Sequence, residues 1–229
     1  MLKYVIFDLD DTILDFHRGE IEGLTKIFKK YGIPKDQIKL GIKKYLKINA
    51  DVWHKIEQGY NRETLLHTRF TKLFAEMNLS VDGFKVEQEY RQMNSHNYYI
   101  KAGAKTMLAN LKGAGLQLIV GTNGVKKTQL RRLDGSGVGK FFNDVFISED
   151  IGYSKPDPRF FDSIFKEKPK MNPKNSIMVG DSLLSDIHGA NNVNLSSIWY
   201  NPSGQKNLTK FLPTYIASNF KSIQDIIIR

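Results

Sequence analysis

The chain has 229 residues, of which 41% are hydrophobic and 25% are charged, an ordinary composition for a globular protein with one sizeable core or a core and a smaller insertion. It contains no cysteine, which excludes disulfides, thiolate metal sites and a cysteine nucleophile. The net charge of +10 is spread along the chain without a dense basic block, so it favours a solvated lysine-rich surface over a nucleic-acid-binding one.

The first predicted element is a short buried strand over residues 4–7, and two acidic residues follow it. Asp8 and Asp10 lie two positions apart, so in an extended chain both side chains project to the same side. A core strand has no structural use for two charges at its tip, because their desolvation must be offset by a metal, a substrate or a proton-transfer role. Asp8 and Asp10 are therefore the first candidate site residues.

The next part of the chain, residues 15–98, shows helical patterns and no strand pattern. The predicted helices cover residues 19–31, 36–58, 62–77 and 81–98. An apolar stripe on the third of these helices indicates core packing. Because this all-helical segment follows the first strand directly, we expect a helical cap domain over residues 15–98, inserted into a core made of residues 1–14 and 99–229.

Strands and helices alternate through the rest of the chain. Further strands are predicted over residues 116–121, 145–147, 176–179, 197–200 and 214–217, and a last helix over 221–228. This alternation is typical of an α/β fold with a doubly wound parallel sheet.

Polar side chains follow several of these strands. Thr122 and Asn123 come after the second strand, Asp181 and Asp186 follow a later one, and a loop between them offers Lys155. In a parallel sheet all these tips open onto one crevice. Carboxylates gathered there raise one another's pKa unless a cation intervenes, and an oxygen-only ligand set favours Mg²⁺.

Such a constellation suits phosphoryl transfer. One aspartate can attack phosphorus and form an aspartyl-phosphate, while a second protonates the leaving oxygen and later deprotonates water. Lysine and Mg²⁺ would neutralise the transferring group. Taken singly, Asp10 or Asp181 could be a helix cap, Thr122 a turn residue and Lys155 a surface residue. Their expected convergence in one crevice favours the functional interpretation.

Four motifs in this order resemble the haloacid dehalogenase-type phosphatase superfamily. They are Asp8-x-Asp10-x-Thr12, the strand-borne Thr122, Lys155-Pro156, and Gly180-Asp181 followed by Asp186. The resemblance implies a Rossmann-like core with an inserted helical cap.

The resemblance also implies roles for individual residues. Asp8 would be the nucleophile and Asp10 the general acid and base, with Lys155 completing the catalytic set. Thr122 and Lys155 would hold the phosphate, and Asn123 is a further phosphate-binding candidate because its amide follows the same strand and suits an anion. Mg²⁺ would be bound by Asp8, Asp181 and the backbone carbonyl of Asp10, with Asp186 supporting the metal shell.

Within the superfamily, the chain is similar to YjjG/YfnB-type pyrimidine 5′-nucleotidases. The stretches that carry this similarity are residues 7–16, 53–59, 69–70, 122–125, 129–133, 147–149 and 180–187. Residues 188–194 depart from the family's small residues and glycine turn, although Asn194 can take the left-handed conformation that glycine favours.

The similarity implies hydrolysis of nucleoside 5′-monophosphates, with a preference for pyrimidine and deoxyribonucleotide substrates. Phe16 or Trp53 could stack on the base, although a tryptophan at such a position is more typical of core packing.

Alternatives remain open at this stage. A sugar-phosphate phosphatase or a phosphoglucomutase-like enzyme would share the core and the cap. A haloacid dehalogenase is disfavoured, because it needs no Mg²⁺ and usually lacks the second aspartate. A degenerate phosphate- or nucleic-acid-binding module is supported only by the net charge of +10.

We expect a cytoplasmic enzyme whose partner is a small phosphate ester. The sequence shows no signal-peptide pattern and no apolar run of membrane-spanning length. No membrane or nucleic-acid partner is expected, and the sequence leaves the oligomeric state undetermined.

Overall fold

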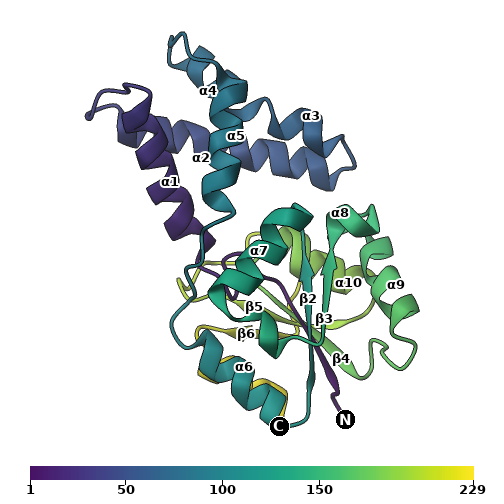
Figure 1. The fold of residues 1–229 in the computed structure, drawn as a ribbon. Helices are drawn as coiled ribbons and strands as arrows, with labels where there is room; N and C mark the ends of the chain where they lie inside the picture. The colour runs from purple at the N-terminus through teal and green to yellow at the C-terminus, as the bar shows by residue number, and fades with distance from the viewer. The chain divides into compact units, whose positions relative to one another are not determined.

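The computed structural model describes residues 1–229, and the chain forms two compact units (Figure 1). The core unit comprises Met1–Asp15 and Tyr98–Arg229, and the helical unit comprises Phe16–Asn97. The helical unit is thus an insertion in the sequence of the core unit. None of the helices combines the length and apolar character that a membrane crossing requires.

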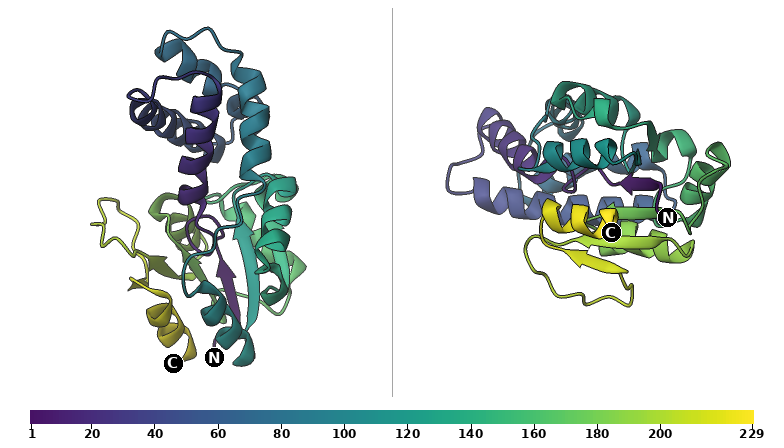
Figure 2. Two further views of the ribbon diagram at one scale, coloured as in Figure 1. Left: turned by 60° about the vertical axis from the view of Figure 1, so that its left-hand side comes forward. Right: turned by 90° about the horizontal axis from the view of Figure 1, so that it is seen from below.

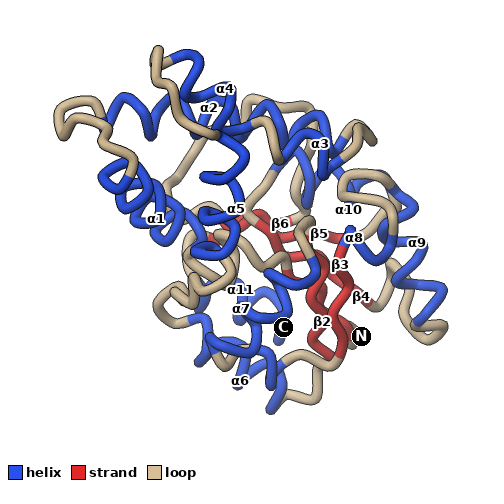
Figure 3. Tube along the Cα trace, turned by 45° about the horizontal axis from the view of Figure 1, so that its top comes forward, coloured by secondary structure: helices blue, strands red, loops and turns tan.

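The core unit contains a six-stranded, all-parallel sheet with strand order β3-β2-β1-β4-β5-β6 (Figure 3). The strands are β1 (Tyr4–Phe7), β2 (Gln117–Thr122), β3 (Asp144–Ile147), β4 (Ser176–Gly180), β5 (Ser196–Tyr200) and β6 (Tyr215–Ala217). The predicted α/β fold with a parallel sheet is confirmed, and each predicted strand is present.

Helices and short helical turns connect these strands, and Figure 2 shows them beside the sheet in two further views. They are α6 (Ala104–Gly113), α7 (Lys126–Ser136), η1 (Gly139–Phe141), α8 (Ser148–Ile151), α9 (Pro158–Glu167), the π-helical turn η2 (Leu183–Ile187), α10 (His188–Asn192) and α11 (Phe220–Ile228). Asn194, just before β5, has a φ of 53°, which is the left-handed conformation expected from the sequence.

The alternation of side chains along β1 explains the layers of the core unit. Val5 and Phe7 pack into an apolar cluster with residues of α6, α7 and α11. Ile6 belongs to a different cluster, which contains residues of α9 and α10. Because successive side chains of a strand point to opposite faces, the sheet is buried between two layers of helices.

The strand register brings three strand tips together. Phe7 of β1 lies beside Val120 of β2 on one side and Val179 of β4 on the other. The amide of Asp8 still donates to the carbonyl of Val179 at 2.9 Å, so the pairing continues one residue past β1. The residues that follow these three parallel strands therefore emerge at the same edge of the sheet.

The helical unit contains no strand, as its sequence pattern predicts. Its helices are α1 (Phe16–Lys30), α2 (Ile38–Glu57), α3 (Arg62–Leu66), α4 (Arg69–Glu76) and α5 (Gly83–Asn94). Apolar residues of α1, α2, α4 and α5 form one buried cluster, which gives this unit a core of its own.

The single helix predicted over residues 62–77 is wrong, because the structure divides it into α3 and α4. The Thr68 hydroxyl donates to the carbonyl of Leu65 at 2.8 Å, and the Arg69 Nε donates to the carbonyl of Leu66 at 3.3 Å. A continuous helix would use these two carbonyls for backbone N–H groups four residues later. Side-chain donors thus compete with the helical hydrogen bonds and break the helix at this point.

A buried ion pair links two helices of the helical unit. Arg69 of α4 donates to both carboxylate oxygens of Glu87 of α5, and one of these bonds is 3.2 Å long. Arg69 also donates to Asn49 at 2.8 Å, and Asn49 in turn donates to Glu20 of α1 at 3.2 Å. Glu87 and Arg69 are both buried, and Arg91 also donates to Glu87 at 3.0 Å, so the charge of Arg69 depends on Glu87 for compensation.

We expect Glu87→Gln to destabilise the helical unit strongly, because it leaves the buried Arg69 guanidinium without its counterion. The expected loss in the free energy of unfolding is about 3–5 kcal/mol. Urea unfolding followed by circular dichroism measures it. Glu89→Gln on the same helix is the matched control, since Glu89 pairs with the solvent-exposed Lys30. Equal midpoints for the two variants would contradict the importance of the buried pair.

Candidate active site

Lys155 is buried at the edge of the sheet where β1, β2 and β4 end, with 1% of its surface exposed. Its Nζ donates to Asp8 Oδ1 at 2.7 Å, to Asp186 Oδ1 at 2.6 Å and to the carbonyl of Gly121 at 2.7 Å. An ammonium has three N–H groups, so these bonds use all of them. Lys155 therefore joins the tips of β1 and β2 to the segment after β4.

The side-chain amide of Asn123 holds the loop that carries Lys155. Asn123 Oδ1 accepts from the Lys155 backbone N–H at 2.9 Å, and Asn123 Nδ2 donates to the Lys155 carbonyl at 2.8 Å. The side chain of Asn123, which the sequence offers as a phosphate ligand, thus fixes the backbone that carries the lysine.

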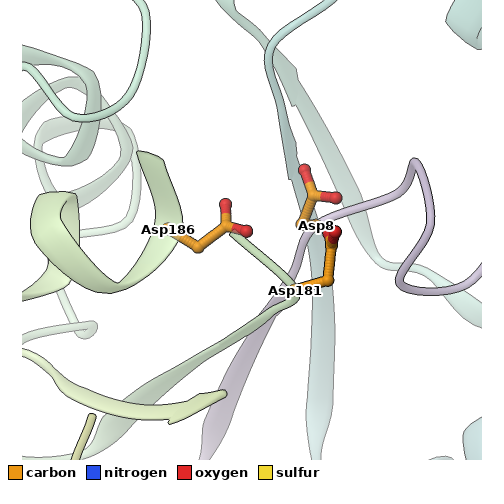
Figure 4. A group of neighbouring side chains, drawn as sticks. All are labelled: Asp8, Asp181 and Asp186. Carbon is orange, nitrogen blue, oxygen red and sulfur yellow. The ribbon is translucent and has the colours of Figure 1, made fainter. Parts of the chain in front are cut away.

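Three carboxylates gather beside Lys155. Single oxygen atoms of Asp8, Asp181 and Asp186 all lie within 4.8 Å of one another, and Figure 4 shows the side chains directed toward one another. Asp186 also accepts from the Ser182 backbone N–H at 3.0 Å. A Cβ at Gly180 would lie 2.1 Å from Asp186 Oδ2, so only glycine permits this close approach.

Asp181 is positioned by contacts from two other parts of the core unit. The Thr12 hydroxyl donates to Asp181 Oδ1 at 3.1 Å, and the same hydroxyl accepts from the Asp181 backbone N–H at 3.1 Å. The indole of Trp199 donates to the Asp181 carbonyl at 2.8 Å. Thr12 therefore couples the turn after β1 to the turn after β4.

Burial and mutual repulsion raise the pKa of two of these carboxyl groups. The pKa of Asp8 rises to about 7: burial is the main cause, the charge of Lys155 opposes the rise, and the charges of Asp186 and Asp10 add to it. Burial, with the charges of Asp8 and Asp186, also raises the pKa of Asp181 well above its ordinary value. Burial alone would lower the pKa of Lys155, but the two neighbouring carboxylates raise it.

This chemistry fits a divalent cation. Three carboxylates face one ammonium, so full ionisation leaves an excess of negative charge that a cation would remove. All donors are oxygen atoms, which suits Mg²⁺ better than metals that prefer nitrogen or sulfur. Both oxygens of Asp186 already accept N–H bonds, so Asp8 and Asp181 are the better placed ligands.

Asp10 lies outside this carboxylate group and has different partners. Arg132 of α7 forms an ion pair with Asp10 Oδ1, and Gln129 Nε2 donates to Asp10 Oδ2 at 2.9 Å. The same Gln129 Nε2 donates to the hydroxyl of Thr122 at 2.9 Å. Asp10, Thr122 and α7 thus form one hydrogen-bonded group.

Gln129 and Arg132 were assigned no role by the sequence reasoning. Their stretch, residues 129–133, entered only as part of a family resemblance. The available signal was their spacing of three positions on a helix that follows Thr122, because residues at that spacing share one helix face. Ser182 was missed as well, since its contribution is a backbone N–H.

Phe16 and Trp53, the two candidate base-stacking residues, belong to the helical unit. Phe16 is the first residue of α1 and Trp53 lies within α2, and both are half-buried. The guanidinium of Arg62 lies 5.9 Å from the centre of the Trp53 ring. Their proposed contact with a substrate stays a prediction.

Comparison with known proteins places this site in a family. Residues 5–200 match the model of the haloacid dehalogenase-like hydrolases. The chain is 34% identical to the putative HAD-hydrolase YfnB of Bacillus subtilis, over 98% of this chain and 95% of that protein. It is 33% identical to the pyrimidine 5′-nucleotidase PynA of Streptococcus pneumoniae, over 98% of this chain and 94% of that protein.

A solved structure agrees with these relatives. The crystal structure of YfnB bound to magnesium superposes with a TM-score of 0.89 and covers 99% of this chain and 98% of that one. The pyrimidine 5′-nucleotidase YjjG of Escherichia coli is 26% identical over 98% of this chain and 97% of that protein. The resemblance derived from the motifs is confirmed, and the chain belongs to the haloacid dehalogenase-like hydrolase family.

Proposed function

We propose that this protein is a Mg²⁺-dependent phosphomonoester hydrolase that works through an aspartyl-phosphate on Asp8. The observation that carries the proposal is the buried contact of Lys155 with Asp8, beside the acidic residues Asp181 and Asp186. A binder of anions gains nothing from clustered carboxylates, whereas a phosphoryl-transfer site needs both the nucleophile and the cation ligands.

The residues divide the reaction between them. An ionised oxygen of Asp8 attacks phosphorus, the ester P–O bond breaks, and Asp10 gives its proton to the leaving oxygen. Asp10 then takes a proton from the water that attacks phosphorus, the phosphorus–Asp8 bond breaks, and inorganic phosphate leaves. Lys155 holds Asp8 in place and supplies positive charge beside it, while the hydroxyl of Thr122 would donate to the transferring group.

Mg²⁺ would be held by Asp8, Asp181 and the backbone carbonyl of Asp10, with Asp186 in a supporting position. When bound, it would supply positive charge to the transferring phosphoryl group. Support comes from the oxygen-only donors, from the raised pKa of Asp8 and of Asp181, and from the magnesium in the YfnB structure.

The substrate class that we propose is the nucleoside 5′-monophosphates, with a preference for pyrimidine and deoxyribonucleotides. Two relatives named pyrimidine 5′-nucleotidase match this chain over almost its whole length, including the helical unit. Phe16 and Trp53 remain the candidates for contact with the base.

A substrate panel tests the reaction and its substrate class together. We expect Mg²⁺-dependent phosphate release, with kcat/KM for dUMP and dTMP above that for hexose phosphates. Asp8→Asn should lower turnover by about 10⁴-fold or more, because it removes the nucleophile. The exposed Asp162→Asn is the matched control and should retain full activity. Faster hydrolysis of hexose phosphates would overturn the nucleotidase proposal, and turnover by Asp8→Asn would overturn the nucleophile.

Mg²⁺ binding should depend on pH in a defined direction. Folding raises the pKa of Asp8 to about 7, so the folded protein loses stability as the pH rises from about 4 to about 7, and above pH 7 it carries the full cost of an ionised Asp8 unless a cation binds. Bound Mg²⁺ at about 100 times its Kd stabilises a protein by about 2.7 kcal/mol. We therefore expect a larger Mg²⁺-induced rise in Tm at pH 8 than at pH 6.

Thermal unfolding with and without Mg²⁺ at the two pH values measures this effect. Asp181→Asn should lose most of the shift, whereas Asp162→Asn should retain it. A shift that is equal at both pH values, or larger at pH 6, would contradict the proposed metal site.

Lys155→Met should reduce both stability and activity. It leaves Asp8 and Asp186 buried without their counterion, at an expected cost of about 3–5 kcal/mol. The cost should be larger at pH 8 than at pH 5, because protonation of the carboxylates relieves their repulsion. Loss of the ammonium that contacts Asp8 should also lower kcat by about 10²–10³-fold.

Urea unfolding and steady-state kinetics measure the two losses. The control is Lys127→Met, which removes an exposed lysine of α7. A Lys155→Met protein as stable and active as this control would show that the buried ammonium serves neither purpose.

A further inference from the structure

We propose that Gln129 and Arg132 of α7 are positioning residues. They hold the side chain of Asp10 in place for proton transfer and the hydroxyl of Thr122 in place for contact with phosphate. The inference rests on the proposed function, because Asp10 is the general acid and base of that reaction. The inference adds to the proposed site the side chains of Gln129 and Arg132, which lie 119 and 122 positions after Asp10 in the sequence.

Both oxygens of the Asp10 carboxylate are held from α7. Arg132 pairs with Oδ1, and Gln129 donates to Oδ2 at 2.9 Å. The Arg132 side chain is 1% exposed, whereas that of Asp10 is 31% exposed. The buried cation therefore holds a carboxylate that is itself partly exposed.

The orientation of the Gln129 amide follows from its contacts. Arg132 Nη1 donates to Gln129 Oε1 at 3.0 Å, which directs Nε2 toward Asp10 and Thr122. A guanidinium has no acceptor, so the oxygen and not the nitrogen of the amide must face Arg132. A Cβ at Gly124 would lie 2.7 Å from Gln129 Cγ, so the glycine makes room for this side chain.

The same amide sets the polarity of the phosphate-binding hydroxyl. Because Thr122 Oγ1 accepts from Gln129 Nε2, its own proton is available to another acceptor. A phosphate oxygen of the substrate is such an acceptor. One network therefore orients the Thr122 hydroxyl as a donor to the transferring group and holds Asp10, which in its protonated form would give its proton to the leaving oxygen.

If Gln129 and Arg132 position Asp10, replacing them should lower kcat/KM most for substrates whose leaving group needs a proton. The 5′-oxygen of a nucleotide leaves as a strongly basic alkoxide unless it is protonated, whereas p-nitrophenolate leaves without a proton. The parameter kcat/KM covers the steps up to release of the leaving group, so it reports this difference without the later hydrolysis of the aspartyl-phosphate. General acid catalysis contributes about 10²–10⁴-fold.

The experiment compares kcat/KM for dUMP and for p-nitrophenyl phosphate in Mg²⁺-loaded full-length protein. Arg132→Met should lower the dUMP value by about 10²-fold or more while the p-nitrophenyl phosphate value falls far less. Arg132→Lys keeps a cation and should fall between Arg132→Met and the wild type. Arg131→Met, an exposed arginine on the same helix, should match the wild type.

Gln129→Met supplies an independent variant in case Arg132→Met fails to fold, which Tm measurements would reveal. It removes the amide from both Asp10 and Thr122, so we expect a selective loss with dUMP together with a higher KM for both substrates. Equal losses with both substrates for the folded variants, or no loss, would overturn the positioning role. Absence of phosphate release by the wild type would instead refute the proposed function itself.

Discussion

The buried ammonium of Lys155 between Asp8 and Asp186 is the contact on which the candidate site depends. Its three acceptors lie at the end of β1, in β2 and in the turn after β4, so the lysine fixes the positions of these three segments relative to one another. Removing it from water is tolerable only because all three N–H groups are bonded. One ammonium still cannot neutralise three ionised carboxylates, and a bound cation would offset the remaining negative charge.

Much of this arrangement could be predicted from the sequence, because it follows from strand patterns. A buried run that ends in Asp8 indicates a strand tip, and parallel strands bring their tips to one edge of the sheet. That rule is enough to place Thr122 and Asp181 near Asp8, whereas Lys155 lies in the loop between α8 and α9 and not at a strand tip. It says nothing about which atoms meet, and the use of the Asn123 side chain to hold the lysine loop became visible only in the structure.

The features that escaped prediction depend on partners far away in the chain. Arg132 looks like an ordinary polar residue of a helix until Asp10 is brought to it. The break between α3 and α4 arises because the Arg69 guanidinium, held by Glu87 of another helix, also takes a carbonyl that a continuous helix would use. Local patterns of apolar and polar residues cannot predict either feature, since both depend on tertiary contacts that override the local preference of the chain.

The partners of Asp8 and Asp10 explain how two carboxylates two positions apart can perform different tasks. Asp8 is held by Lys155 beside Asp186, where the ammonium, and a cation if one binds, would favour the ionised form that the proposed mechanism needs for attack on phosphorus. The side chain of Asp10 is held instead by α7, outside the carboxylate group of Asp8, Asp181 and Asp186, and it is more exposed than that of Asp8. The turn after β1 thus supplies two aspartate side chains with different surroundings: Lys155 contacts one of them, and residues of α7 contact the other. In the proposed mechanism, a nucleophile and a proton donor would therefore come from one short segment, each with its own positively charged partner.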